Sequence, residues 1–381
     1  MRRMPPPSIE VSISMSKQLL FLPGPVTVAR PVLEAAARPM IDHRGPQFAE
    51  MLERVVGALR PVYGTSGEIA VLGSSGTGAM EAAIVNLFSP GERLLSCPVG
   101  AFGKRFAAIA HGYGCVVESL ATPLGSALDP QALRRRLEDD TQGSIAGVLL
   151  THNETSTGVA NDMAALAPIL RAHGALTLVD SVSGLGASEF LMDAWGYDAV
   201  AAASQKAFAA PPGVATVALS ERARARLVDR GSSRYYFDLR TAMEFARIGQ
   251  TPWTPPISIL FALDVALERY HAEGMQAAFA RHARNARYVR GALQRLGFTL
   301  FSQPGAHSDT VVAAYPPAGV DPALLLRQLR EKYGVVLSGG QGELAGKIVR
   351  FGTMGAVGEA DFAAAVGAIE STLAELTSGV A

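Results

Sequence analysis

The sequence predicts an α/β protein with a mostly parallel sheet in a large domain and a smaller α+β domain at the C-terminus. From residue 68 onward, short apolar runs alternate with segments of helical periodicity, which is typical of parallel strands joined by helices. The runs at 145–151, 175–180 and 198–203 are too short and too continuously apolar for half-exposed antiparallel strands. After about residue 257 longer helical patterns take over, which predicts the second domain.

The elements of the large domain follow in a regular order. We expect strands at 68–72, 93–99 and 115–120, and helices at 78–87, at 102–110 and from 129. Asp129-Pro130 and Asp321-Pro322 mark helix starts, because Asp can cap a helix and Pro fits its first position. The small domain should hold an Arg-rich helix over 281–296 and strands at 310–315, 334–338 and 347–351. Arg281, Arg284, Arg287 and Arg290 are expected to line a solvated face of that helix.

The domain prediction divides the chain into three parts: a flexible leader over 1–20, a large domain over 21–273 and a small domain over 274–381. The leader begins Met1-Arg2-Arg3, but three prolines and Glu10 follow where a signal peptide needs an apolar stretch. No window approaches 18 uninterrupted apolar residues, so no membrane-spanning helix is expected. We therefore expect a soluble, cytoplasmic protein.

Composition narrows the classes of partner. Of the 381 residues 49% are apolar and 18% charged, so the chain can bury a large core. Lys+Arg and Asp+Glu both number 34 with no basic cluster, which argues against nucleic acid as a partner. Cys97 and Cys115 cannot form a disulfide framework or a four-cysteine zinc site, and the histidines show no metal-ligand spacing.

Three segments carry residues suited to chemistry. Gly73-Ser74-Ser75-Gly76-Thr77-Gly78 joins a strand to a helix, where glycines and free N–H groups suit a phosphate, although such a turn is equally often structural. Asp180 ends an apolar run, where a carboxylate can face a ligand or cap a helix. Lys206 follows a buried strand in a turn-rich setting, where partial burial would lower an amine's pKa and favour a nucleophile, although a lone lysine at a strand end is more often an ordinary solvent-exposed one.

Together the three segments point to one cofactor. Pyridoxal 5′-phosphate (PLP) requires a phosphate cradle, a carboxylate for its ring nitrogen and a lysine that binds it covalently. A nicotinamide dehydrogenase is the alternative from another class, but it leaves Lys206 and Asp180 without a role and lacks its glycine fingerprint here. A ligand-sensing regulator would need a DNA-binding domain, for which about 20 residues before Pro23 are too few.

In these motifs the sequence resembles the class V aminotransferases of the fold-type I PLP enzymes, particularly the alanine–glyoxylate, serine–glyoxylate and serine–pyruvate branch. The resemblance covers nearly the whole chain. The matching segments, in order, are Leu22-Pro23-Gly24-Pro25, Asp42-His43-Arg44, the turn at 73–78, Thr151-His152-Asn153-Glu154-Thr155-Ser156-Thr157-Gly158, Asp180-Ser181-Val182, Ser204-Gln205-Lys206, Ala210-Pro211-Pro212-Gly213, Gly339-Gly340 and Arg350-Phe351-Gly352-Thr353-Met354-Gly355.

The resemblance implies a seven-stranded large-domain sheet, a homodimer with shared active sites, and a role for each matching residue. Lys206 would bind PLP covalently and move the substrate proton, and Asp180 would keep the ring nitrogen protonated. The resemblance places further contacts as follows: Ser75, Gly76, Thr77 and Gln205 at the phosphate, Thr254 at the neighbouring subunit's phosphate, Thr155 at the phenolic oxygen, Phe102 on the ring, and Gly24 and Arg350 at the substrate. Phe102 stands where several relatives have tryptophan. We assign no role to His43 or His152.

The resemblance implies amino transfer from alanine or serine to glyoxylate or pyruvate. A 2-aminoethylphosphonate–pyruvate aminotransferase has the same fold and remains open. A cysteine desulfurase would need a nucleophilic cysteine in the C-terminal half, whereas both cysteines precede residue 116.

Overall fold

The computed structural model describes residues 18–227 and 234–378, and its centre is a seven-stranded sheet. In spatial order the strands are β2 (Glu68–Ser74), β10 (Gly213–Leu219), β9 (Ala199–Ala203), β8 (Leu176–Asp180), β5 (Ile145–Thr151), β3 (Arg93–Cys97) and β4 (Val116–Ser119). From β9 to β4 all neighbours are parallel, while β10 runs antiparallel to β2 and β9. The predicted mostly parallel sheet is confirmed, and β10 is a strand that we did not predict.

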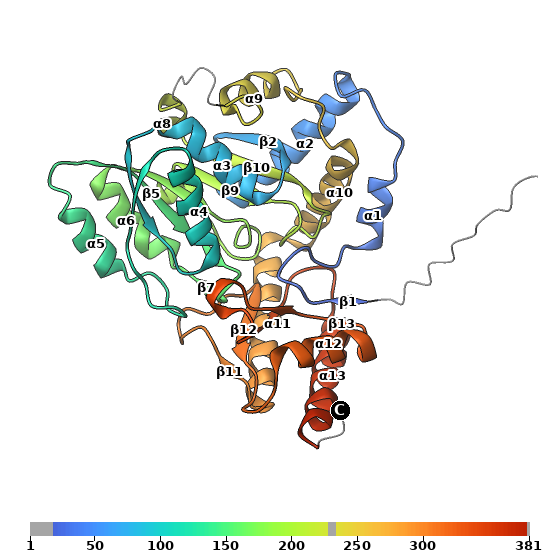
Figure 1. The fold of residues 1–381 in the computed structure, drawn as a ribbon. Coiled ribbons are helices and arrows are strands. Elements are labelled where there is room, and N and C mark those ends of the chain that lie inside the picture. The colour runs from blue at the N-terminus through green and yellow to red at the C-terminus, as the bar shows by residue number, and fades with distance from the viewer. Residues whose placement is uncertain (1–17, 228–233, 379–381) are drawn as a thin grey trace, which may run out of the picture.

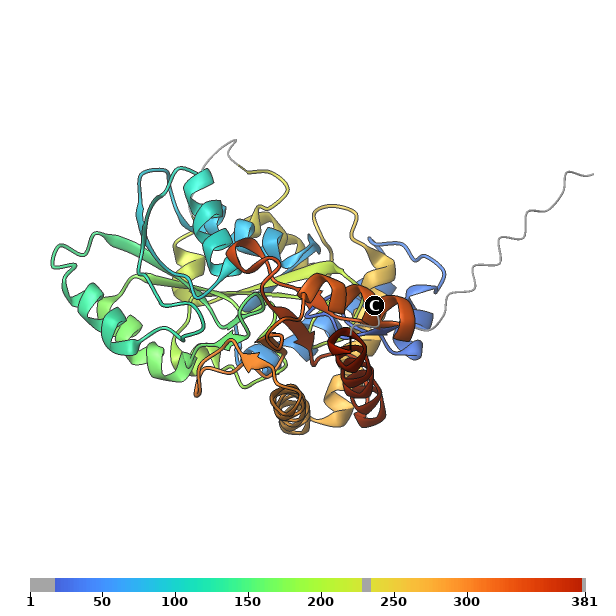
Figure 2. The same cartoon turned by 60° about the horizontal axis from the view of Figure 1, so that its bottom comes forward.

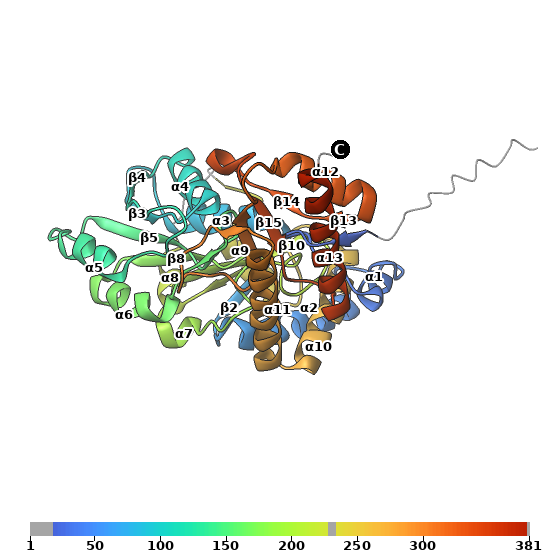
Figure 3. The ribbon, with the colours of Figure 1, turned by 90° about the horizontal axis from the view of Figure 1, so that it is seen from below.

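Helices cover both faces of this sheet, as Figures 1 and 3 show. One face carries α3 (Gly76–Leu87), α4 (Ala101–Gly112) and α9 (Leu239–Ala246), and the other carries α2 (Pro46–Tyr63), α5 (Pro130–Glu138), α6 (Met163–His173) and α10 (Ile257–Glu273). Three short helices complete this part: α1 (Arg30–Ala36), α7 (Met192–Trp195) and α8 (Glu221–Ala225). Because both faces are covered, the central strands are apolar on both sides, which explains their continuous runs.

A second, antiparallel sheet lies beside the first, below it in Figure 1 and forward in Figure 2. Its order is β11 (Thr299–Leu300), β12 (Val311–Tyr315), β15 (Val349–Gly352) and β14 (Ser338–Gly339). The helices α11 (Met275–Arg295), α12 (Pro322–Tyr333) and α13 (Glu359–Thr377) pack against it around Phe21, Phe351 and Phe362. Among the helices of the described part of the chain, none is both long and apolar enough to cross a membrane.

Leu19 and Leu20, which we placed at the end of a flexible leader, form an ordered strand instead. This strand, β1 (Leu19–Leu20), pairs in parallel with β13 (Val335–Val336), and Leu19 packs against the small-domain core. The rest of the predicted leader, residues 1–17, lies outside the described residues. Burial of the two apolar leucines offsets the entropy that is lost when they are ordered. The polar and Pro-rich stretch before them gave no sign of this in the sequence.

The predicted solvated arginine face of α11 is only partly correct. Arg284 and Arg287 are exposed as expected, and Arg281 forms an ion pair with Glu273. Arg290 instead turns toward the segment before β12, where its Nη1 donates to Ser308 O at 2.9 Å. This arginine therefore joins a helix to the small sheet, which charge periodicity alone does not reveal.

Candidate active site

The predicted lysine and carboxylate meet because their strands are neighbours. Thr151 at the end of β5 pairs with Asp180 at the end of β8, and Asp180 pairs with Ala201 in β9. Lys206 follows β9 by three residues. Ligands of α/β sheets bind at the carboxyl ends of parallel strands, and here this edge carries both groups.

Lys206 is nearly enclosed, with 9% of its surface exposed. Its Nζ donates a hydrogen bond to Pro23 O at 2.6 Å. Burial lowers the lysine's pKa to about 8, against the opposing charge of Asp180. A substantial fraction of the amine is therefore neutral just above neutral pH, which is the form that attacks an aldehyde.

Gly24 explains how the N-terminal segment can pass so close to this lysine. A Cβ atom at Gly24 would lie 2.7 Å from Lys206 Nζ, and the φ angle of +131° is one that side chains disfavour. The glycine predicted at the substrate thus also leaves room for the lysine amine.

Asp180 is 3% exposed and only partly satisfied. Its Oδ1 accepts a hydrogen bond from Val182 N at 3.0 Å, and no described residue donates to Oδ2. Burial raises the carboxyl pKa to about 7. A cationic ring nitrogen at Oδ2 would favour the ionised carboxylate, so this environment suits the partner of a pyridinium.

His152, to which we assigned no role, supports the carboxylate's backbone. Its N–H donates to Asp180 O at 2.8 Å, and its Nδ1 lies 2.8 Å from Ser181 Oγ. The other ring nitrogen, Nε2, lies 3.2 Å from Ser188 Oγ. Burial lowers the imidazole pKa to about 4, so the ring is neutral at physiological pH. Its two nitrogens contact Ser181 and Ser188 and so support the segment that follows Asp180.

The start of α3 has the form of an anion site. Ser75 occupies the N-cap position without a side-chain cap, so the N–H groups of Gly76 and Thr77 remain available. Gln205, just before the lysine, buries its side-chain Oε1 without a partner among the described residues. Since the amide can be flipped to present its N–H₂ group, this unpaired end fits a phosphate oxygen.

Phe102 lies in the first turn of α4. Arg105 places its guanidinium 4.7 Å from the centre of the Phe102 ring and donates to Thr77 Oγ1 at 3.2 Å. The aromatic side chain and the predicted phosphate turn are therefore linked through one arginine, which the sequence analysis did not single out.

Arg350 brings the small domain into the site. It lies in β15, is 4% exposed, and donates from Nε to Gly339 O at 2.7 Å and from Nη1 to Thr155 O at 2.9 Å. Burial lowers the guanidinium pKa to about 10, so it stays cationic at neutral pH. No described residue accepts from Nη2, which leaves that end of the fork for a carboxylate.

Thr254 is the predicted contact to a second subunit, and within this chain its side chain is exposed. Its loop is held by Arg44, whose Nη1 donates to Gln250 Oε1 at 2.8 Å and to Thr251 O at 2.7 Å. The sequence motif at 42–44 contained this arginine, but nothing in the pattern indicated that it holds a loop two hundred residues away.

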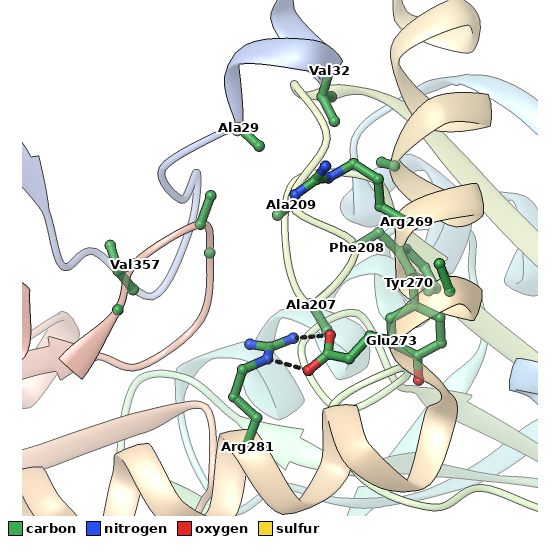
Figure 4. A pocket seen from close by; sticks show the side chains of 15 residues that line it. Ala29, Val32, Ala207, Phe208, Ala209, Arg269, Tyr270, Glu273, Arg281 and Val357 are labelled. Atoms are coloured by element: carbon green, nitrogen blue, oxygen red, sulfur yellow. Dashed lines mark hydrogen bonds and ion pairs between the residues drawn. The ribbon is translucent and has the colours of Figure 1, made fainter.

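A cavity of about 710 Å³ lies apart from these residues and is shown in Figure 4. Ala207, Phe208 and Ala209, which follow the lysine, form one wall, and the Arg281–Glu273 ion pair forms another. None of the predicted site residues lines it. The cavity is thus separate from the lysine–carboxylate edge.

The fold and the buried lysine–carboxylate pair define a fold-type I PLP-dependent enzyme. A model of the family described as aminotransferase class-V matches residues 32–354, and the chain belongs to this family. It is therefore a transaminase, because class V aminotransferases of this fold are PLP-dependent transaminases.

Individual relatives match over most of their length. The chain is 36% identical to the L-aspartate–glyoxylate aminotransferase of Paracoccus denitrificans, over 95% of this chain and 92% of that protein. It is 37% identical to a Synechococcus sp. (strain PCC 6716) protein named soluble hydrogenase, small subunit, over 94% of each. The solved alanine–glyoxylate aminotransferase of Nostoc sp. has a TM-score of 0.90 at 30% identity, covering 95% of this chain and 97% of that one.

The cysteines and the metal-ligating side chains bear on two other chemistries, catalysis by a cysteine nucleophile and binding of a metal ion. Cys97 and Cys115 are both buried, and burial raises the Cys97 pKa to about 12, so that thiol is a poor nucleophile. Within residues 18–227 and 234–378, no group of three or more His, Cys, Asp or Glu side chains is placed to hold a metal ion.

The environment of Asp180 gives a prediction about the cofactor-free protein. The pKa of this carboxyl is near 4 in the unfolded chain and about 7 in the folded protein. The folded protein therefore loses stability as the pH rises from about 4 to about 7, because the carboxyl ionises more readily in the unfolded chain. We expect Asp180→Asn to stabilise the cofactor-free protein at pH 8 by roughly 1 to 3 kcal/mol, as it removes a buried, underpaired charge. Urea unfolding at pH 5 and pH 8 measures this, and a variant equally or less stable at pH 8 would contradict it.

Proposed function

We propose that this class V aminotransferase binds PLP at the edge formed by β5, β8 and β9 and transfers the amino group of a small amino acid to a small 2-oxo acid, with glyoxylate as the first candidate. The observation that carries the proposal is the convergence of Lys206, Asp180 and Arg350, three buried ionisable groups from three segments. Perturbed ionisable groups gathered at a ligand-binding edge are characteristic of catalytic sites.

The chain's own residues divide the work. When bound, PLP supplies an aldehyde and a ring that takes up electrons from the substrate's α-carbon. The neutral amine of Lys206 would bond to that aldehyde with loss of water, and after the substrate's amine has displaced it, the freed amine would accept and return the α-proton. Asp180 would keep a proton on the ring nitrogen, and Ser75, Gly76, Thr77 and Gln205 would hold the phosphate. Thr155 would donate to the phenolic oxygen, and Phe102 would cover one face of the ring and exclude water there.

Substrate selection rests on Arg350. Its free Nη2 and the adjacent Nη1 can form a two-pronged ion pair with an α-carboxylate, which fixes the α-carbon over the lysine. The two named aminotransferases above share glyoxylate as acceptor and differ in donor, aspartate in one and alanine in the other. This supports glyoxylate more firmly than any single donor, so aspartate belongs beside alanine and serine as a candidate.

The site is completed by a second copy of the chain. Thr254 is exposed and held in a fixed loop by Arg44, as a residue that serves a neighbouring subunit should be. We therefore propose a homodimer in which each Thr254 binds the phosphate in the partner's site.

A half-reaction screen tests the function. Purified protein loaded with PLP should lose its visible absorbance on mixing with the correct amino donor, and glyoxylate should restore it. Alanine, serine, aspartate and 2-aminoethylphosphonate are the donors to compare. Lys206→Ala should lower the rate by at least about 10³-fold, because the covalent link and the proton carrier are both lost. The proposal would be refuted if the wild-type protein took up no PLP, or if none of the amines removed the absorbance of the bound PLP.

A conservative change tests the carboxylate grip. Arg350→Lys should raise KM for an amino acid donor by about 10- to 100-fold, because lysine cannot form the two-pronged pair. The rate of the half-reaction with 2-aminoethylphosphonate should change far less, because this donor has no carboxylate. Half-reaction kinetics with each donor alone, without a 2-oxo acid, measures the difference, with the exposed Arg287→Lys as control. Equal losses for the two donors would exclude the assigned role.

Hybrid dimers test the shared site. Thr254→Ala alone should weaken PLP binding, because it removes one hydrogen bond to a charged phosphate. Co-expressing chains that carry Lys206→Ala with chains that carry Thr254→Ala should create one wild-type-like site per hybrid dimer. Equilibrium PLP titration of the purified hybrid should then show wild-type affinity at half the sites. Affinity that stays at the Thr254→Ala value would mean that Thr254 acts within its own chain or not at all.

A further inference from the structure

A second buried carboxylate, outside the predicted set, ties together two segments of the site. Glu154 lies in the short strand β6 (Asn153–Glu154), which pairs with β7 (Val159–Ala160), and it has no exposed surface. Its Oε1 accepts from Ser156 N at 3.0 Å and Ser156 Oγ at 2.6 Å. Its Oε2 accepts from Phe102 N and Gly103 N, each at 3.0 Å.

The Glu154 carboxylate caps the N-terminus of α4, although Glu154 lies outside this helix. Ala101 N donates to Ser156 Oγ at 2.9 Å, so Glu154 and Ser156 together satisfy the first three N–H groups of α4. A negative charge at this end is favoured by the helix dipole and by charge-assisted hydrogen bonds. Gly100 makes the approach possible, because a Cβ there would collide with the Glu154 side chain.

Both segments that Glu154 joins carry predicted cofactor contacts. Phe102 itself belongs to the first turn of α4, and Thr155 directly follows Glu154. The carbonyl of Thr155 also accepts the hydrogen bond from Arg350 Nη1. One side chain therefore links the helix turn that carries Phe102 to the segment that carries Thr155, whose carbonyl holds Arg350.

Charge gives Glu154 a second means of influence. Asp180 and Glu154 both raise the pKa of Lys206, and Glu154 raises that of Arg350, in each case against the larger lowering by burial. Each hydrogen bond to Glu154 comes from a neutral donor, so its charge is not cancelled by a direct ion pair. It remains available to offset the two cations across the site.

We propose that Glu154 is a positioning residue of the PLP site: its carboxylate fixes Phe102 and Thr155 relative to each other, and so sets the orientation of the cofactor ring between them. The proposal rests on the proposed function, since it needs PLP at this edge. Glu154 need not touch the cofactor, because it acts through Phe102, Thr155 and Arg350.

The test compares two buried carboxylates that both accept backbone hydrogen bonds. Glu154→Gln keeps the size of the side chain but removes its charge and turns N–H₂ toward one pair of donors. Asp198→Asn is the matched control, because Asp198 is also buried and accepts from Thr177 N and Arg222, yet it lies at the opposite end of β8 and β9. Three measurements are made on each: amide exchange of residues 100–106 without PLP, the Kd for PLP, and the visible circular dichroism of bound PLP.

We expect Glu154→Gln to speed amide exchange at 100–106, to raise the PLP Kd by at least about 10-fold and to alter the visible circular dichroism per bound PLP. Asp198→Asn should lower the melting temperature and leave all three near wild type. Faster exchange in Glu154→Gln with an unchanged Kd and an unchanged dichroism would reduce Glu154 to a helix cap and overturn the proposal.

A milder variant keeps the test decisive if Glu154→Gln does not fold. Ser156→Ala removes one donor to Oε1 and the acceptor of Ala101 N, but it retains the carboxylate. A change in the visible dichroism with a Kd raised about 3-fold would support the proposal, and wild-type values for both would overturn it. Failure of the proposed function looks different, because wild-type protein would then bind no PLP at all.

Discussion

The structure depends on burying a lysine and a carboxylate together at one edge of a parallel sheet. A charge on either group alone would lower the stability of the folded protein. Burial therefore lowers the pKa of Lys206 and raises the pKa of Asp180, so that both lie close to neutral pH. Neighbouring strands β8 and β9 bring them together, and their apolar interiors exclude the water that would restore ordinary ionisation. A ligand that bonds to the amine and places a cation beside the carboxylate would compensate both groups at once. The proposed cofactor has these two features.

Around this pair the protein places charges from more distant parts of the chain. Arg350 comes from β15 of the small sheet and Glu154 from β6, so that four buried ionisable side chains lie within range of one another's charge. His152 and Glu154 do not reach outward but anchor the backbone of the reactive segments. On the large-domain side, main-chain N–H groups therefore donate to buried side chains, and Arg350 reaches this region from the other sheet.

Much of this could be predicted from the sequence, for identifiable reasons. The strands β5, β8 and β9 are short, apolar and buried on both faces. Asp180 ends such a run and Lys206 follows another, so the local composition predicts where these two residues lie. By contrast β10 was missed although Gly213–Leu219 is equally apolar, because two prolines before it suggested a loop. Glu154, Arg44 and Arg105 were missed as well, because a charged residue in a polar motif gives no local sign that its partner lies 52, 207 or 28 residues away, respectively.

The hydrogen bond from Arg350 to Thr155 O joins the two sheets at the point where a substrate would arrive. Nη1 of Arg350 is engaged in that hydrogen bond, whereas Nη2 has no acceptor among the described residues. One guanidinium thus ties the small sheet to the turn after β6 and also presents a free N–H end. Truncating Arg350 would therefore remove a link between two parts of the chain together with a candidate ligand contact.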